Sequence, residues 1–135
     1  MAINYTWKEE YNTGVKFIDE QHKYFLNIVK DLKEYIENGV CMDSASKIFF
    51  SLVHYAEHYL IQEEIYFKDY QFPSTSEHKE LHAAFIQRVI QFKTDYEKDI
   101  IHTCQTMQEY LVDWFENHIL KYDKEAIEYL KGKGL

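Results

Sequence analysis

The chain consists of long amphipathic segments separated by short polar breaks. Between Val15 and Asn38, one stripe has members three and four residues apart, which is the spacing of a single helix face. This stripe contains Ile18, His22, Phe25, Val29, Leu32 and Ile36. Gly39 follows, and glycine readily adopts the left-handed backbone that closes a helix. The pattern therefore predicts a helix over residues 15–38.

The same spacing predicts further helices. The second begins at residue 43 or 44 and continues to about residue 70, before the break "QFPSTS". The third follows Ser74, and its stripe contains His78, Leu81, His82, Phe85, Val89, Phe92 and Tyr96. The fourth begins between residues 99 and 103 and carries Cys104, Met107, Leu111, Trp114 and His118 on one face. A short last helix is expected over residues 123–130.

The order and length of these segments indicate the fold class. Amphipathic helices joined by short loops are typical of an up-down-up-down bundle. Four Gly and one Pro among 135 residues leave little turn chemistry for a protein of many strands. We therefore expect an all-α, antiparallel four-helix bundle with a short C-terminal helix, formed by residues 1–135 as a single domain.

Charge and cysteine content narrow the class of protein. The net charge is -8 and the chain has no cluster of Lys or Arg, which argues against nucleic acid or an anionic membrane as a partner. No segment has the length of a bilayer-spanning helix, and the N-terminus lacks the apolar core of a signal peptide. Cys41 and Cys104 belong to no CxxC motif, so we expect two reduced cysteines. We expect a cytoplasmic protein that is a monomer.

Several histidines lie on stripes that should face the interior of the bundle. They are His22, His78, His82 and His118, and they come from three different helices. His78 and His82 are four residues apart, so both imidazoles can reach one ion. Four buried imidazoles without a metal would need four separate sets of hydrogen-bond partners. The sequence therefore favours a metal site over four separate core histidines.

Carboxylates should complete such a site. Asp123 follows His118 by five residues, which on a regular α-helix places the two side chains about 140° apart. We therefore expect the helix to end or kink between them, and Asp123 could also cap the short last helix. From the opposite side of the bundle, Glu63 of the second helix is the carboxylate expected to face Asp123.

The phase of the second helix separates its inward residues from its polar ones. The apolar stripe runs through Leu52, Ala56 and Tyr59, and Glu63 follows Tyr59 by four residues. His54 and His58 form a conspicuous HxxxH pair, but they fall on the polar stripe. The pattern therefore directs Tyr59 and Glu63 to the core and both histidines to solvent.

Three segments resemble the hemerythrin family, and in particular its single-domain bacterial kind. They are "YNTGVKFIDEQHKYF", "EEIYFKDYQFPSTSEHKELHAAF" and "WFENHILKYDK". The resemblance implies a cofactor of two iron ions, bridged by an oxo or hydroxo group, inside a four-helix bundle. It also implies that the partner is O₂ or another small diatomic or peroxide ligand.

The resemblance assigns roles to individual residues. The implied metal ligands are His22, Glu63, His78, His82, His118 and Asp123. One iron would take the histidines of the third and fourth helices, and the other would take His22 and a residue of the second helix. The two carboxylates would bridge the irons. Trp114, Phe115 and Ile119 fall where the family lines its O₂ pocket with bulky apolar groups.

The second helix departs from the family pattern. Family members usually have a histidine four residues before the bridging glutamate, where this chain has Tyr59. Two arrangements are open: a regular helix with Tyr59 as the ligand, or a π-bulge that turns His58 inward instead.

A tyrosine ligand would alter the chemistry of the iron. A phenolate is a hard anion that favours Fe(III) over Fe(II), so ligation by Tyr59 would weaken reversible O₂ binding. The first hypothesis is a non-haem di-iron protein that stores, delivers or scavenges O₂ without chemistry on a substrate. The alternative is a di-iron enzyme of the oxidase or peroxidase kind, or an iron or redox sensor, that works from the ferric state.

Overall fold

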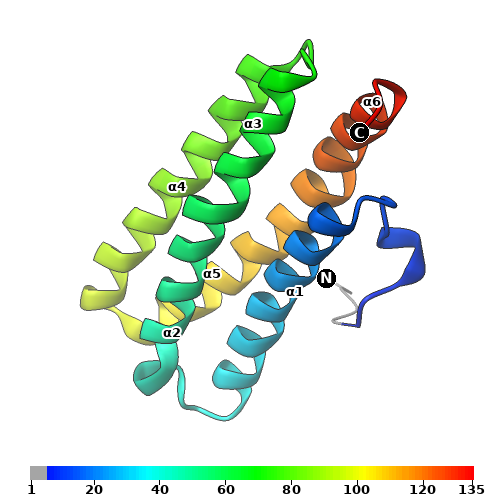
Figure 1. The fold of residues 1–135 in the computed structure, drawn as a ribbon. Coiled ribbons are helices and arrows are strands. Elements are labelled where there is room, and N and C mark those ends of the chain that lie inside the picture. Colours follow the sequence, from blue (N-terminus) through cyan, green and yellow to red (C-terminus); the bar gives the residue numbers. More distant parts are fainter. Residues whose placement is uncertain (1–5) are drawn as a thin grey trace.

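The structure is a computed structural model that describes residues 6–135, apart from the side chains of residues 42 and 43. Residues 1–5, which belong to the single domain expected from the sequence, lie outside this range. Over the described residues the chain is helical and contains no strand, and its elements join into four long rods (Figure 1). The all-α class expected from the sequence is confirmed.

Two rods are single α-helices, namely α1 (Lys16–Glu37) and α4 (Thr75–Lys98). The second rod joins α2 (Cys41–His54), the π-helix η2 (Tyr55–Leu60) and α3 (Ile61–Asp69). The fourth joins α5 (Ile100–Asp113), the π-helix η3 (Trp114–Asp123) and α6 (Lys124–Gly132). A 3₁₀ turn, η1 (Glu9–Tyr11), precedes the first rod. Successive rods run in opposite directions, as expected for an antiparallel bundle (Figure 1).

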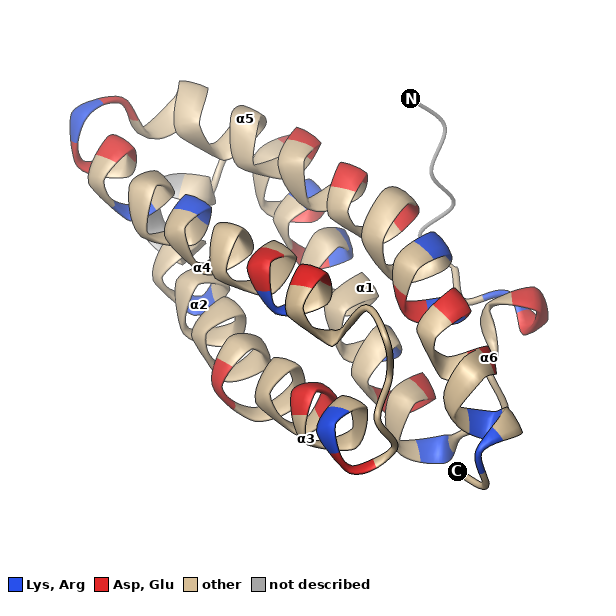
Figure 2. Ribbon diagram, turned by 90° about the horizontal axis from the view of Figure 1, so that it is seen from above, with Lys and Arg blue, Asp and Glu red and all other residues tan. Residues whose placement is uncertain are grey.

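Acidic and basic residues are both distributed over the outside of the described bundle (Figure 2). In the view from above, acidic and basic positions are spread over the rods (Figure 2). Within the described residues, no helix is both long enough and apolar enough to cross a membrane.

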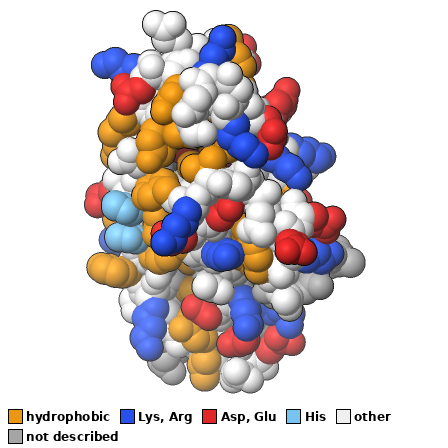
Figure 3. Space-filling model, turned by 45° about the vertical axis from the view of Figure 1, so that its right-hand side comes forward, with side chains coloured by type: hydrophobic (Ala, Val, Ile, Leu, Met, Phe, Trp, Pro, Cys, Tyr) orange, Lys and Arg blue, Asp and Glu red, His pale blue; other side chains and the backbone are white. Residues whose placement is uncertain are grey.

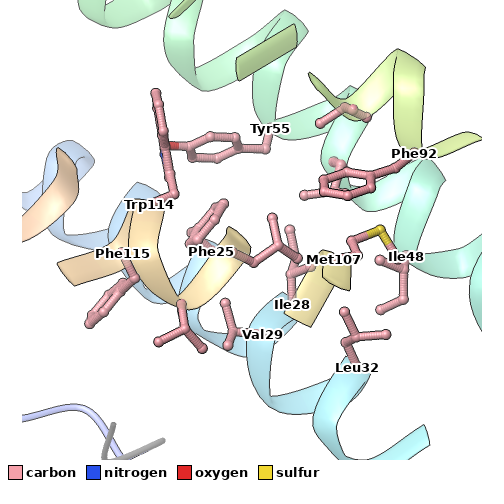
Figure 4. Packing of buried hydrophobic residues seen from close by; sticks show 14 of the residues in the cluster. Phe25, Ile28, Val29, Leu32, Ile48, Tyr55, Phe92, Met107, Trp114 and Phe115 are labelled. Atoms are coloured by element: carbon pink, nitrogen blue, oxygen red, sulfur yellow. The ribbon is translucent and has the colours of Figure 1, made fainter. Parts of the chain in front are cut away.

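Aromatic side chains pack among aliphatic ones in the core between the rods (Figure 4). Phe25 of α1 packs against Tyr55 at 4.9 Å between ring centroids, and Phe85 of α4 packs against Trp114 at 4.4 Å. Full burial of a side chain of this size stabilises a fold by about 1.5–3 kcal/mol. Contacts of this kind fix the level of each rod relative to its neighbours. The position of any polar group in the interior depends on these levels.

Of the two arrangements open for the second helix, the structure has the π-helical one, but this π-turn directs Tyr55 inward and not His58. Tyr55 and Leu60 are five residues apart, yet both are buried, and the backbone between them is π-helical. The wider turn of a π-helix takes up one extra residue and so rotates the preceding part of the rod. As a result Tyr55 faces the core, whereas Tyr59 is only partly buried and His58 is exposed.

The helix neither ends nor kinks between His118 and Asp123, so this expectation from the sequence is wrong. Both residues belong to the π-helix η3, and the rod continues directly into α6. Because π-helical hydrogen bonds join residues five apart, side chains at that spacing lie on nearly the same face. The π-turn therefore directs both side chains inward without breaking the rod. Asp123 makes no capping hydrogen bond to α6.

The segment before α1 ties the first rod to the last. The Asp19 carboxylate accepts hydrogen bonds from the backbone N–H of Thr13 at 2.7 Å and from the Thr13 hydroxyl at 2.8 Å. Gly14 has a φ of 89°, a conformation that most L-residues avoid, and it lets the chain turn here. Lys131 of α6 donates to the Thr13 carbonyl at 2.7 Å. These bonds fix the end of α1 that carries His22.

The expectation of two reduced cysteines is wrong. Cys41, at the start of α2, and Cys104, on α5, form a disulfide across 63 residues of sequence. It joins the second and fourth rods within the apolar core.

Reduction of this disulfide should lower the free energy of unfolding by roughly 2–4 kcal/mol, because the cross-link restricts the unfolded chain. Urea denaturation followed by circular dichroism, with and without dithiothreitol, measures the effect. The Cys41→Ser/Cys104→Ser variant is the control, since its midpoint should not respond to the reductant. A wild-type midpoint that is equally insensitive would show that the two thiols are not joined.

Candidate metal centre

Five buried side chains from three rods converge inside the bundle. They are Glu63, His78, His82, His118 and Asp123, and their ligand atoms all lie within 4.8 Å of one another. Glu63 comes from α3, and His78 and His82 come from α4. His118 and Asp123 come from η3. None is more than 4% exposed. Imidazole and carboxylate together form a donor set suited to transition metals.

Asp123 contacts histidines of three rods. Its Oδ1 lies 2.8 Å from Nε2 of His78 and 3.1 Å from Nε2 of His118. Its Oδ2 lies 3.2 Å from Nε2 of His22, a residue of α1 that is 1% exposed. The two oxygens of one carboxylate thus face different histidines.

Glu63 divides its contacts in the same way. Its Oε1 lies 3.1 Å from Nε2 of His78 and 3.1 Å from Nε2 of His82. Its Oε2 accepts a hydrogen bond of 2.8 Å from Nε2 of Gln21, which is fully buried on α1. One oxygen of each carboxylate therefore faces the histidines of α4 and η3, and the other faces α1.

Two of the histidine rings are held by further neighbours. Nδ1 of His82 lies 2.9 Å from Oε2 of Glu64, which turns Nε2 of the same ring toward Glu63. The ring of Trp114 stacks on His118 with centroids 3.8 Å apart and planes 11° apart. Such outer contacts orient a ligand ring and restrict its motion.

Contacts with carboxylates raise the pKa of both α4 histidines. Burial alone would lower the pKa of His78, but hydrogen bonds and negative charge from Asp123 and Glu63 raise it to about 9. Burial likewise opposes protonation of His82, and contacts with Glu63 and Glu64 raise its pKa to about 10. Without a metal, positive charge on these rings compensates the buried carboxylates.

The two carboxylates are held in their ionised form. Burial and the charge of Asp123 would raise the pKa of Glu63, but contacts with His78 and His82 lower it. Burial would also raise the pKa of Asp123, yet the charge of His118 and the histidine contacts hold it well below its usual value. Two adjacent buried anions are thus available as ligands.

Unpaired polar atoms show that these residues fit a metal. Among the described residues, Oε1 of Glu63, Nε2 of His82 and both ring nitrogens of His118 are buried without an aligned hydrogen bond. Such an atom typically costs about 1–3 kcal/mol. Coordination to a metal ion would satisfy the oxygen and one nitrogen of each ring at once. His22 was predicted from the same stripe and lies beside this group through Asp123.

The structure does not bring Tyr59 or its alternative, His58, into the group. The Tyr59 ring packs between Phe17, at 5.7 Å, and Tyr24, at 5.3 Å. Burial, together with the neighbouring Tyr24 and Glu20, raises its pKa, so the phenol keeps its proton. His58 stacks on His54 at 5.3 Å, and both are exposed, as the phase of the helix predicts. Histidine side chains reach the surface in Figure 3.

Tyr55 and Gln21 are the interior residues that sequence reasoning missed. The Tyr55 hydroxyl accepts a hydrogen bond of 3.2 Å from Nε1 of Trp114 (Figure 4). Burial raises the pKa of Tyr55 well above its usual value, and the charges of Asp123 and Glu63 add to this effect. One signal for Tyr55 was present in the sequence. The five-residue spacing of His58 and Glu63 allows a π-bulge in the second helix, and such a bulge changes which of the preceding residues face the core.

The residues expected to line an O₂ pocket are buried on η3. Trp114 is 8% exposed, Phe115 0% and Ile119 1%. Trp114 covers one face of His118, and Phe115 packs against Tyr11 of the N-terminal segment. On another side, a cavity of about 330 Å³ lined by His78, Leu81 and Tyr122 approaches the group from solvent.

Comparison with known proteins agrees with this geometry. The chain matches the family model of the hemerythrin HHE cation binding domain over residues 13–130. It is 31% identical over 130 residues to the bacteriohemerythrin of Clostridium acetobutylicum, covering 92% of this chain and 99% of that protein. Identity to a bacteriohemerythrin of Pseudomonas aeruginosa is 24% over 127 residues, covering 93% and 80%. Identity to the myohemerythrin of Theromyzon tessulatum is 24% over 115 residues, covering 85% and 84%.

A helical bundle with imidazoles and carboxylates converging in its core is a metal-binding domain. This chain belongs to the hemerythrin family. The resemblance read from three short segments is thereby confirmed.

The metal-free protein should lose stability as the pH rises. The raised pKa values of His78 and His82 contribute stability that is complete below the ordinary value of 6.5 and is lost through about 9 and 10. The lowered pKa of Asp123 contributes stability above its ordinary value of 3.8, which is lost in acid. Urea midpoints of chelator-treated protein should therefore be highest between these two ordinary values.

His82→Ala should flatten the alkaline decline, and His58→Ala, which changes an exposed histidine, should leave it intact. A wild-type midpoint that stays constant or rises between neutral pH and pH 10 would contradict the charged arrangement of the metal-free site.

Proposed function

We propose that this protein binds O₂ reversibly at a non-haem di-iron centre and so stores, delivers or scavenges it. The observation that carries the proposal is that the two oxygens of each carboxylate face different groups. Oδ1 of Asp123 and Oε1 of Glu63 face one set of histidines, whereas Oδ2 and Oε2 face His22 and Gln21 of α1. Two carboxylates divided in this way can bridge two ions.

The first metal position is rich in ligands. We assign it to the three histidines of α4 and η3, with one oxygen from each carboxylate. The contacts of 2.8–3.1 Å between these rings and the carboxylates support the assignment. Three imidazoles and two carboxylate oxygens would leave this ion little room for an external ligand.

The second metal position has fewer ligands. His22 is the imidazole near Oδ2 of Asp123, and neither Tyr59 nor His58 reaches this region. His22 and the two carboxylates would hold an ion there and leave it open coordination sites, and a reduced iron pair would supply the electrons that O₂ binding needs. The exposed HxxxH pair takes no part.

The surroundings of the second position suit a small dioxygen-like ligand. Trp114, Phe115 and Ile119 are buried on η3, where they would exclude water from the centre and so limit oxidation of a reduced metal pair. The Tyr55 hydroxyl keeps its proton, accepts a hydrogen bond from Trp114 and also contacts Gln21, and its own O–H would donate to a bound ligand. A protonated, unligated tyrosine also avoids the strong preference for Fe(III) that a phenolate ligand would impose.

Residues 1–135 are proposed to act as one hemerythrin-like domain. We also propose a cytoplasmic location, although a disulfide such as Cys41–Cys104 is rare in that compartment. The ligand would be O₂, with other small diatomic molecules or peroxide as competitors for the same position.

Iron content and O₂ cycling test the function together. The purified protein should hold two irons per chain, and after anaerobic reduction its visible spectrum should change with air and return under argon over repeated cycles. His78→Ala removes a ring that contacts both carboxylates and should abolish loading of the iron pair. His58→Ala is the matched control and should bind two irons and cycle normally.

Irreversible oxidation in the first exposure to air, with release of peroxide, would contradict O₂ carriage and favour oxidase-like chemistry. Equal loss of iron from both variants would contradict the assignment of the site.

Replacing Tyr55 and Tyr59 in turn tests which of the two tyrosines interacts with bound O₂. Tyr55→Phe removes the O–H proposed to donate to bound O₂ and should speed O₂ dissociation about tenfold, since a hydrogen bond is typically worth about 1 kcal/mol or slightly more. Tyr59→Phe should leave dissociation unchanged, because its ring packs against Phe17 and Tyr24. Stopped-flow measurement of O₂ release compares the two. A large effect of Tyr59→Phe with none from Tyr55→Phe would reverse the assignment.

A further inference from the structure

The face formed by the second rod and α4 is more apolar than the rest of the described surface. Six exposed large hydrophobic residues lie along it, namely Phe50, Val53, Ile61, Ile65, Ile86 and Ile90. Phe50 is 75% exposed and Ile90 is 55% exposed. A gathering of exposed apolar residues on one face marks an interaction surface more often than scattered apolar residues do.

The face is also hollowed. A groove of about 620 Å³ runs between α2 and α4, and its walls are mainly apolar. They include Phe49, Phe50, Val53, Val89, Ile90 and Tyr96. Lys93 and Glu97 form its charged end.

The exposed residues of α4 are arranged symmetrically about the midpoint between Ile86 and Ile90. Lys79 lies seven residues before Ile86, and Glu97 lies seven residues after Ile90. All four side chains are exposed, and neither Lys79 nor Glu97 forms an ion pair with any described residue. An antiparallel copy of α4 centred on this midpoint would place Ile86 beside Ile90 and Lys79 beside Glu97 at both ends.

The second rod has a similar, approximate symmetry. Val53 and Ile61 lie four residues on either side of Glu57, and Phe50 and Ile65 lie seven and eight residues away on the same two sides. Two contacts between the rods show that the midpoints are at one level. Phe49 packs on Tyr96 at 5.7 Å, and Glu64 meets His82 at 2.9 Å, so residue 57 lies opposite residues 88 and 89.

From this arrangement we propose that the face binds a second copy of the chain, antiparallel and related by a two-fold axis. The axis passes between Ile86 and Ile90, so α4 packs on α4 and the second rod packs on its own copy. Such self-complementarity is what a two-fold interface requires and what a different partner would not need. This proposal departs from the monomer expected from the sequence.

The size of the face agrees with a modest dimer. A helix of 24 residues is about 36 Å long, and two helices side by side are about 20 Å wide. The face therefore covers roughly 700 Å², close to the roughly 800 Å² per partner of a typical stable interface. Glu57 would meet its own copy near the axis, which weakens the association.

Sedimentation velocity of the iron-loaded full chain over a range of concentrations tests the proposal. The mass should rise from 16.4 kDa toward twice that value and no further. Ile90→Glu should keep the chain at 16.4 kDa throughout, whereas Ile101→Glu, which alters a 70% exposed residue outside this face, should behave as wild type.

Charge exchange tests the antiparallel register. Lys79→Glu places two carboxylates together at each end and should weaken dimerisation at least tenfold, and Lys79→Glu combined with Glu97→Lys should restore it. Glu57→Gln should strengthen it by removing the repulsion near the axis. Thermal unfolding of each variant verifies that the bundle itself is intact.

Wild-type protein that remains at 16.4 kDa, or that forms larger open assemblies, would overturn the two-fold dimer. Sedimentation of a monomeric chain with phospholipid vesicles would assign the face to a lipid surface instead. A dimer unaffected by Ile90→Glu, or one not restored by the charge exchange, would place the interface elsewhere.

Discussion

The buried carboxylate of Asp123 is the group on which the structure of this protein depends. Its two oxygens contact His22, His78 and His118, which belong to the first, third and fourth rods. A buried charge is tolerated only when it is paired, so these rods cannot separate at this level without leaving an anion unpaired. Glu63 makes equivalent contacts from the second rod and completes the connection. The residues that would hold the metal thus also hold the four rods in register.

Much of this arrangement follows from the sequence where the helices are regular. The inward positions of His22, His78 and His82 could be predicted because α1 and α4 keep one phase from end to end. A π-turn changes the phase by a whole residue, about 100° on a helix, without requiring any particular residue type. For that reason Tyr59 was predicted to face the core where Tyr55 does. The disulfide was not predictable either, since pairing depends on distances set by the whole fold.

The two sides of the carboxylate pair offer different numbers of ligands, and this difference bears most directly on function. One side of the carboxylate pair offers three imidazoles, and the other offers His22, the amide of Gln21 and a nearby buried phenol. Under the proposed function, the same carboxylates would bridge a saturated ion and an open one, and their division between the two sides would create the place for a small ligand. The apolar residues of η3 would keep water from that place, and they lie on the same π-turn that carries Asp123 inward.

Crystallography of the iron-loaded protein, with anomalous data collected on both sides of the iron absorption edge, tests the central claim most directly. The account predicts two iron peaks joined by the carboxylates of Glu63 and Asp123. One should lie among His78, His82 and His118, and the other beside His22, with Tyr55 nearer to it than Tyr59. A single peak among the three histidines, or a second peak bound to Tyr59 or His58, would contradict it.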